Sequence, residues 1–68
     1  MTEALFIAEF SDPRVGDEIA LAGEEGRHAV AVRRIAVGET VLLADGSGSA
    51  VRGPVLSTDK VSLVMRVE

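Results

Sequence analysis

One stretch of the chain, from Glu24 to Gly38, has the pattern of a helix, and this stretch limits the possible folds more than any other feature. At about 100° per residue, its apolar side chains share one arc. These residues are Ala29, Val32, Ile35 and Ala36. Glutamates stand at its start and arginines near its end, where each charge favours the helix dipole. We therefore predict one α-helix over about residues 24–35, stopped by Gly38.

The rest of the chain consists of short apolar segments of strand length separated by turn residues. These segments are residues 4–10, 15–23, 39–44, 50–57 and 60–67. In residues 15–23, Ile19 and Leu21 are predicted to point inward, and Glu18 and Ala20 outward. Residues 4–10 are apolar on both sides, as in an enclosed strand, and Val61 is predicted to point inward with Leu63, Met65 and Val67. The sequence predicts a mainly β fold: a small barrel of five to six strands with one helix.

Glycines mark the predicted turns. Val15-Gly16-Asp17 is repeated 22 residues later as Val37-Gly38-Glu39, and each copy leads into a strand. We predict that both glycines adopt positive φ. Asp45-Gly46 predicts a hairpin, and Gly53-Pro54 predicts a bulge or an edge position, since proline cannot donate to a ladder.

Composition excludes several classes of protein. Sixty-eight residues make one domain at most, and a chain of this size buries only about 60% of its unfolded surface. The absence of cysteine excludes disulfides and thiolate metal sites. No apolar run approaches the roughly 20 residues of a membrane span, and the first ten residues are acidic where a secretory signal would be basic. We expect a cytoplasmic protein that does not contact a membrane.

A local excess of positive charge is the main functional signal. The net charge is −4, yet no acidic residue lies between Gly26 and Gly38, a window that contains Arg27, Arg33 and Arg34. Guanidinium groups match phosphate oxygens in pairs and stay charged at any relevant pH. We therefore predict RNA contact by these arginines, extended by Arg52 and Lys60. The alternative is that Arg33 and Arg34 only complement the helix dipole.

The order of these motifs resembles a known family. The carrying residues are His28-Ala29-Val30-Ala31-Val32-Arg33-Arg34-Ile35, then Val37-Gly38-Glu39, Asp45-Gly46 and Lys60-Val61-Ser62-Leu63. Together they resemble the N-terminal PUA-like domain of the ribosomal RNA small subunit methyltransferase E family, whose members methylate N3 of a uridine in 16S rRNA. The residues that match the family pattern are His28, Arg34, Gly38, Asp45 and Gly46. One departure is Ala4-Leu5, where many members carry arginine.

The resemblance implies that RNA binding and catalysis belong to different domains. In that family the N-terminal barrel helps bind RNA, while a C-terminal SPOUT domain binds S-adenosylmethionine, dimerises and carries catalysis. Residues 1–68 would be the PUA-like domain, monomeric on its own. They would hold no cofactor, and the SPOUT domain would lie outside them. The implied partners are 16S rRNA and the methyltransferase domain of the same protein.

Other interpretations stay open at this stage. His28 is either an RNA contact or a histidine at the core edge that hydrogen-bonds to backbone. The protein as a whole is either an RNA-binding module or a protein-interaction barrel with an acidic surface, made by Asp17, Glu18, Glu24 and Glu25. A stand-alone enzyme is disfavoured, because Asp45, Ser47, Ser49 and His28 lack the spacing of a nucleophile elbow.

Overall fold

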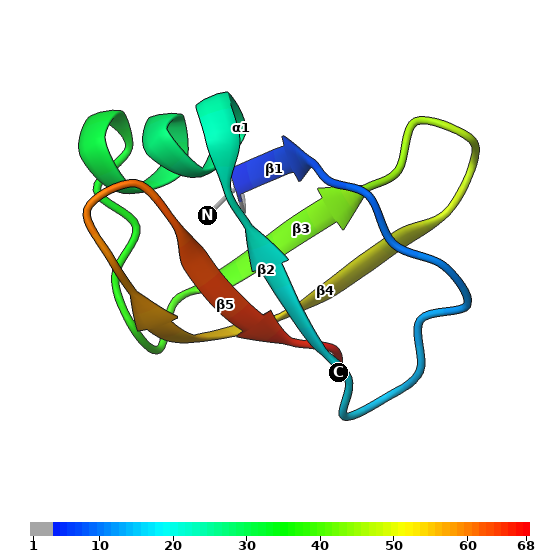
Figure 1. Ribbon diagram of the computed structural model, residues 1–68. Coiled ribbons are helices and arrows are strands. Elements are labelled where there is room, and N and C mark those ends of the chain that lie inside the picture. The colour runs from blue at the N-terminus through cyan, green and yellow to red at the C-terminus, as the bar shows by residue number, and fades with distance from the viewer. Residues whose placement is uncertain (1–3) are drawn as a thin grey trace.

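The computed structural model describes residues 4–68, which form five strands and one helical segment (Figure 1). The strands are β1 (Ala4–Ile7), β2 (Glu18–Leu21), β3 (Thr40–Ala44), β4 (Ala50–Thr58) and β5 (Leu63–Arg66). The helical segment consists of α1 (Gly23–Arg27) and a π-helical turn, η1 (His28–Val32). The predicted mainly β class is confirmed, while the first three residues of the predicted 1–68 domain lie outside the described residues.

The strands form one curled sheet in the order β1-β3-β4-β5-β2. β1 runs parallel to β3, and all other neighbours are antiparallel. β4 pairs with β3 through residues 50–54 and with β5 through residues 55–58, so it joins the two halves of the sheet. The sheet is a half-barrel with β1 and β2 at its edges, and the helical segment lies over one end of it (Figure 1).

The Gly53-Pro54 pair lies where β4 changes partner. The predicted edge position is wrong, because β4 lies between β3 and β5, and the bulge falls between Val55 and Ser57. Val55 N–H donates to the Glu39 carbonyl at 2.8 Å, so the Pro54 nitrogen, one residue away, faces away from β3 and removes no bond from that ladder. Glycine is required before it, since a Cβ on Gly53 would lie 1.7 Å from the Arg66 carbonyl oxygen.

The core consists of the inward-facing residues of all five strands and of Ala29 from the helical segment. Its buried members are Ala4, Phe6, Ala8, Ile19, Leu21, Ala29, Val41, Leu43, Val55, Leu63, Met65 and Val67. Two predictions are wrong. Leu5 and Ile7 are 57% and 53% exposed, because no described element covers the outer face of β1. Val61 is 51% exposed, because it lies in a turn closed by Asp59 N–H donating to the Ser62 carbonyl.

The predicted sequence repeat is also a structural repeat. Gly16 and Gly38 both have φ 95°, as predicted. The Gly16 N–H donates to the Val67 carbonyl at 2.8 Å, and the Gly38 N–H donates to the Val55 carbonyl at 2.9 Å. In each turn, the carboxylate of the following residue, Asp17 or Glu39, accepts from the backbone N–H three residues earlier. Equivalent residues therefore tie two turns to two different strands in the same way.

The helical segment is shorter than predicted and changes pitch. Arg33 N–H donates to the His28 carbonyl at 2.9 Å, five residues back, which defines the π-helical turn. The helical segment ends at Val32, and Arg34 then adopts φ 54°, so the helix stops well before Gly38. The wider turn rotates Val32 off the predicted apolar arc and leaves it 62% exposed, while Ala29 stays buried and Ile35 packs on the core. Ala36 is exposed as well. No helix among residues 4–68 is long and apolar enough to cross a bilayer.

Two residues of α1 fix the helical segment on the sheet. A Cβ on Gly26 would lie 2.5 Å from the Leu21 carbonyl oxygen and 2.6 Å from that of Val61, so α1 contacts the end of β2 and the β4–β5 turn closely. Glu25 Oε1 accepts the Ile7 N–H at 2.8 Å. This bond covers a donor on the outer edge of β1, which would otherwise be open to another strand.

Candidate nucleic-acid interface

The end of the helical segment presents most of the predicted cationic residues. Arg27 is the last residue of α1, His28 is the first residue of η1, and Arg33 and Arg34 follow η1 directly. All four side chains are exposed. We call residues 27–34 the cationic segment. Figure 1 shows the helical segment over one end of the half-barrel.

The arginines of the cationic segment are not neutralised by the rest of the domain. Within residues 4–68, none of Arg27, Arg33 and Arg34 has a carboxylate partner, whereas Arg66 lies 3.7 Å from Glu18. A guanidinium without an internal partner keeps all its donors for a ligand. The contrast matters, because an internally paired arginine would have to lose its carboxylate before it bound a phosphate.

The predicted single α-helix implies one shared face for two of these arginines. An α-helix would place Arg27 and Arg34, seven residues apart, on one face. The observed segment changes to π pitch at His28 and its last helical residue is Val32, so the spacing of a regular α-helix does not extend from Arg27 to Arg34. The cationic segment is therefore a short π-helical turn followed by a left-handed residue, Arg34. It is not a regular α-helix with its arginines on one face.

Arg34 is one of two described non-glycine residues with positive φ. A left-handed conformation costs an L-residue with a Cβ roughly 1–2 kcal/mol, which is why glycine is usual at such helix ends. The Ile35 N–H, directly after it, donates to the Ala29 carbonyl at 3.0 Å and closes the helix. Strained residues and π-helical turns both cluster at functional sites, and here the two are adjacent.

His28 lies exposed beside the core rather than within it. Its ring meets the buried Phe6 ring edge-on, with the ring centroids 6.4 Å apart and an interplanar angle of 66°. No described residue hydrogen-bonds to the imidazole, so the predicted bond to backbone is not observed. Phe6 instead orients the ring by an aromatic contact.

The structure places Lys60 in the turn next to α1 and Arg52 on the sheet. Lys60 precedes Val61, whose carbonyl packs against Gly26 of α1. Arg52 lies on β4, where it is paired with Leu42, and its carbonyl accepts the Glu68 N–H at 2.9 Å. Its neighbours are therefore the middle of the sheet and the last residue of the chain.

The loop between β3 and β4 is a hairpin connection. Asp45 Oδ1 accepts the backbone N–H groups of Ser47 at 2.8 Å and Ser49 at 3.1 Å. The Ser47 N–H in particular lowers the pKa of the Asp45 carboxyl. The carboxylate therefore shapes the loop, and within residues 4–68 no group of three His, Asp or Glu side chains could hold a metal ion.

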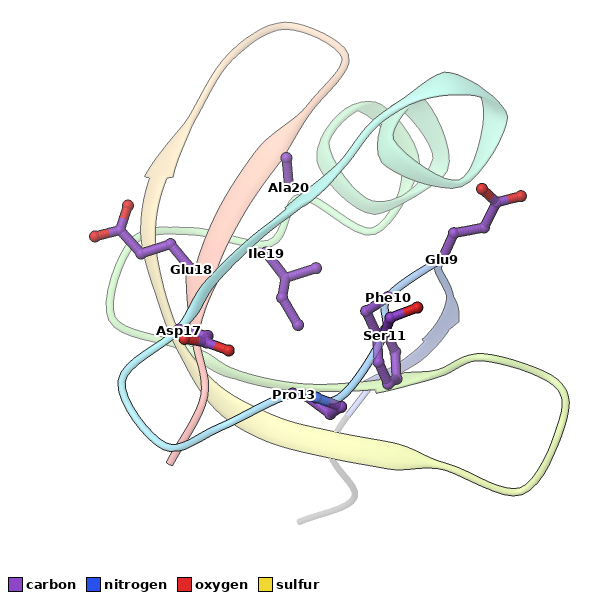
Figure 2. Close-up of a pocket in the computed structure, with 8 residues that line it drawn as sticks. All are labelled: Glu9, Phe10, Ser11, Pro13, Asp17, Glu18, Ile19 and Ala20. Atoms are coloured by element: carbon purple, nitrogen blue, oxygen red, sulfur yellow. The ribbon is translucent and has the colours of Figure 1, made fainter.

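The sequence did not predict a cleft of about 350 Å³. It lies between β2 and the segment after β1, and Figure 2 shows its lining. The lining residues are Glu9, Phe10, Ser11, Pro13, Asp17, Glu18, Ile19 and Ala20. A local sequence pattern cannot predict this cleft, because its two walls are β2 and the segment after β1. Only the curling of the whole sheet brings these two parts of the chain together.

A comparison of this sequence with family profiles decides the family. The profile described as "RNA methyltransferase PUA domain" matches residues 21–68. The chain belongs to this family. The resemblance inferred from the sequence is thus confirmed, and the match covers the cationic segment, β3, β4 and β5. No curated protein matches the chain by sequence.

Two solved structures share the fold of this PUA domain. A putative methyltransferase from Legionella pneumophila, solved with bound S-adenosylmethionine, is 19% identical, with a TM-score of 0.86 over 98% of this chain. A ribosomal RNA small subunit methyltransferase E from Neisseria gonorrhoeae, also bound to S-adenosylmethionine, is 23% identical, with a TM-score of 0.81 over 97% of this chain. This chain spans 27% of the length of each of them.

Proposed function

We propose that this PUA domain binds RNA through the cationic segment and thereby holds a methyltransferase on its RNA substrate. Membership of the RNA methyltransferase PUA family supports the class of partner. The observation that carries the proposal is that Arg27, Arg33 and Arg34 are exposed and lack carboxylate partners among the described residues. In a domain of net charge −4, these arginines make the cationic segment the most favourable place for a phosphate backbone.

The chemistry of the cationic segment suits single-stranded or looped RNA. Arginine pairs with phosphate oxygens and also stacks on bases, and neither contact requires a groove of fixed width. His28 presents an exposed ring held by Phe6, which offers a second stacking surface. Lys60, on the turn that packs against α1, adds a flexible positive charge beside them.

The finer function follows the name of one structural relative. Because the Neisseria gonorrhoeae protein is a ribosomal RNA small subunit methyltransferase E, we infer that the RNA is 16S rRNA and the reaction is methylation of a uridine N3. In this proposal a separate SPOUT domain of the parent enzyme binds S-adenosylmethionine, dimerises and performs the transfer in the cytoplasm. The 68-residue domain itself is monomeric and contributes affinity.

The protein-interaction alternative has less support. Its four carboxylates come from two elements: Glu24 and Glu25 belong to α1, whereas Asp17 directly precedes β2 and Glu18 is its first residue. Three of them are also engaged within the domain. Glu25 binds the Ile7 N–H, Asp17 binds the Arg14 N–H, and Glu18 lies beside Arg66.

Salt dependence tests the proposal. If each of the three arginines neutralises one phosphate of a single-stranded 16S rRNA fragment, log K should fall with log salt with a slope of about −2. Fluorescence anisotropy from 50 to 300 mM KCl measures this slope. No binding at the lowest salt concentration, or a slope near zero, would contradict RNA binding by this segment.

A further inference from the structure

The outer face of β1, β3 and β4 carries an apolar patch. These three strands lie side by side in the sheet (Figure 1). Leu5 is paired with Leu42, Ile7 with Ala44, and Ala44 in turn with Ala50. A neighbour of each along its strand lies in or against the core, so by the alternation of a strand these five residues point outward. We call them the outer patch; Leu5, Ile7 and Ala50 are exposed, and the other two are half-buried.

The chemistry of the outer patch favours a protein face over RNA. None of its side chains is charged, so it offers no ion pair to a phosphate backbone. Exposed apolar patches on soluble domains mark surfaces where another protein surface packs. The partner would pack on the face rather than add a strand at the edge of β1, because Glu25 already accepts the Ile7 N–H at 2.8 Å.

The last residue of the domain lies in the same rows of the sheet. Glu68 N–H donates to the Arg52 carbonyl at 2.9 Å. Arg52 is paired with Leu42, and Leu42 with Leu5. Glu68 and Leu5 are therefore three strand spacings apart, roughly 14 Å along the sheet. An extended linker of about five residues covers this distance, so a domain attached at Glu68 reaches the outer patch through a short connection.

The length of the solved relatives indicates which partner would cover the outer patch. The shared fold extends over 98% and 97% of this chain, but it makes up only 27% of each relative. The proposed function assigns a SPOUT domain to the rest of the parent enzyme, and the present inference rests on that assignment. We propose that the outer patch is the face on which this SPOUT domain packs. The outer patch shares no residue with the cationic segment.

The experiment introduces single cysteines, which this chain lacks, and measures their alkylation by a maleimide in the 68-residue chain and in the parent enzyme. Leu5→Cys and Ala50→Cys lie in the outer patch. Val15→Cys is the matched control, since Val15 is 81% exposed and precedes β2. Because thiol reactivity follows exposure, both patch variants should react roughly tenfold more slowly in the parent enzyme than in the isolated domain. The Val15→Cys variant should react at the same rate in both.

Four outcomes would overturn the proposal. The first is equal alkylation of the patch variants in the two proteins, and the second is a parent protein without a SPOUT domain. A rate in the isolated domain that falls with its own concentration would assign the patch to a second copy. A rate that falls on addition of a 16S rRNA fragment would assign the patch to RNA. Ala50→Cys adds only a sulfur atom to an exposed alanine, so it decides the matter if Leu5→Cys does not fold.

RNA affinity of the same variants separates this proposal from RNA binding itself. Leu5→Cys should leave the affinity of the isolated domain for a 16S rRNA fragment within about twofold of wild type, because distant sites act independently. If the outer patch is protected in the parent enzyme but the domain does not bind RNA, only the RNA-binding proposal fails. If the domain binds RNA and the patch stays reactive in the parent enzyme, only the docking proposal fails.

Discussion

At the scale of single residues, Arg34 combines a backbone cost with a proposed role in binding. Its φ of 54° is unfavourable for a residue with a Cβ. Arg34→Gly should therefore raise the free energy of unfolding by up to about 1 kcal/mol, measured by urea denaturation, while it weakens RNA binding. Stabilisation together with lost affinity would show that the arginine is kept for its side chain.

The matched control is the preceding residue. Arg33 has φ −82°, where glycine relieves no strain and only increases the freedom of the unfolded chain. Arg33→Gly should thus lower stability by about 0.5–1 kcal/mol. If both variants change stability in the same direction, the left-handed conformation of Arg34 carries no cost.

At the scale of elements, the junction in β4 depends on one missing side chain. Because a Cβ on Gly53 would lie 1.7 Å from the Arg66 carbonyl oxygen, Gly53→Ala must push β4 and the end of β5 apart. The expected loss is about 3 kcal/mol or more, which is a large part of the roughly 3–10 kcal/mol that a chain of this size has. Urea denaturation measures the loss.

A glycine in an open loop provides the comparison for Gly53. Gly46 has φ 82° and no atom within 4 Å of its would-be Cβ. Gly46→Ala should cost only the backbone strain, about 1–2 kcal/mol. Equal costs at the two positions would mean that the β4 junction is not tightly packed.

The β3–β4 loop should make a pH-dependent contribution to stability. The Ser47 N–H lowers the Asp45 pKa in the folded state, so the ionised carboxylate stabilises the fold above its unfolded pKa, near 4, and this contribution is lost as pH falls through the lower folded pKa. Asp45→Asn keeps an oxygen acceptor but loses the charge. The urea midpoints of wild type and variant should differ at pH 7 and converge below about pH 4. A difference that is constant with pH would contradict this assignment.

The sequence predicted those elements whose causes are local. Alternation placed Ile19 and Leu21 of β2 inward, and likewise Leu63, Met65 and Val67. Two copies of a Val-Gly-acid motif predicted two positive-φ glycines. The end of the helix was not predictable in this way. An α-helical continuation and a π turn followed by a left-handed arginine use the same residues, and packing of Ala29 and Ile35 on the core decides between them.

At the scale of the whole molecule, the candidate site was only partly predictable. A charge count identified Arg27, Arg33 and Arg34, because they are close in sequence. Long-range packing decides which distant cations join them, and it places Lys60 on the turn against α1 while Arg52 lies on the sheet. The same long-range packing creates the cleft beside β2.

The two faces divide the domain by charge. The cationic segment caps one end of the half-barrel, whereas the acidic cleft opens along β2. This separation makes a position-specific test of RNA binding possible within one chain.

The most direct test compares two charge reversals with identical net charge. Arg34→Glu changes the cationic segment, and Arg14→Glu changes an exposed arginine in the turn before β2, which binds Asp17 through its backbone only. Affinity for a 16S rRNA fragment at 50 mM KCl, measured by fluorescence anisotropy, should fall at least tenfold for Arg34→Glu and less than threefold for Arg14→Glu, because phosphate contacts act locally. Equal losses in the two variants would contradict an RNA-binding site on the cationic segment.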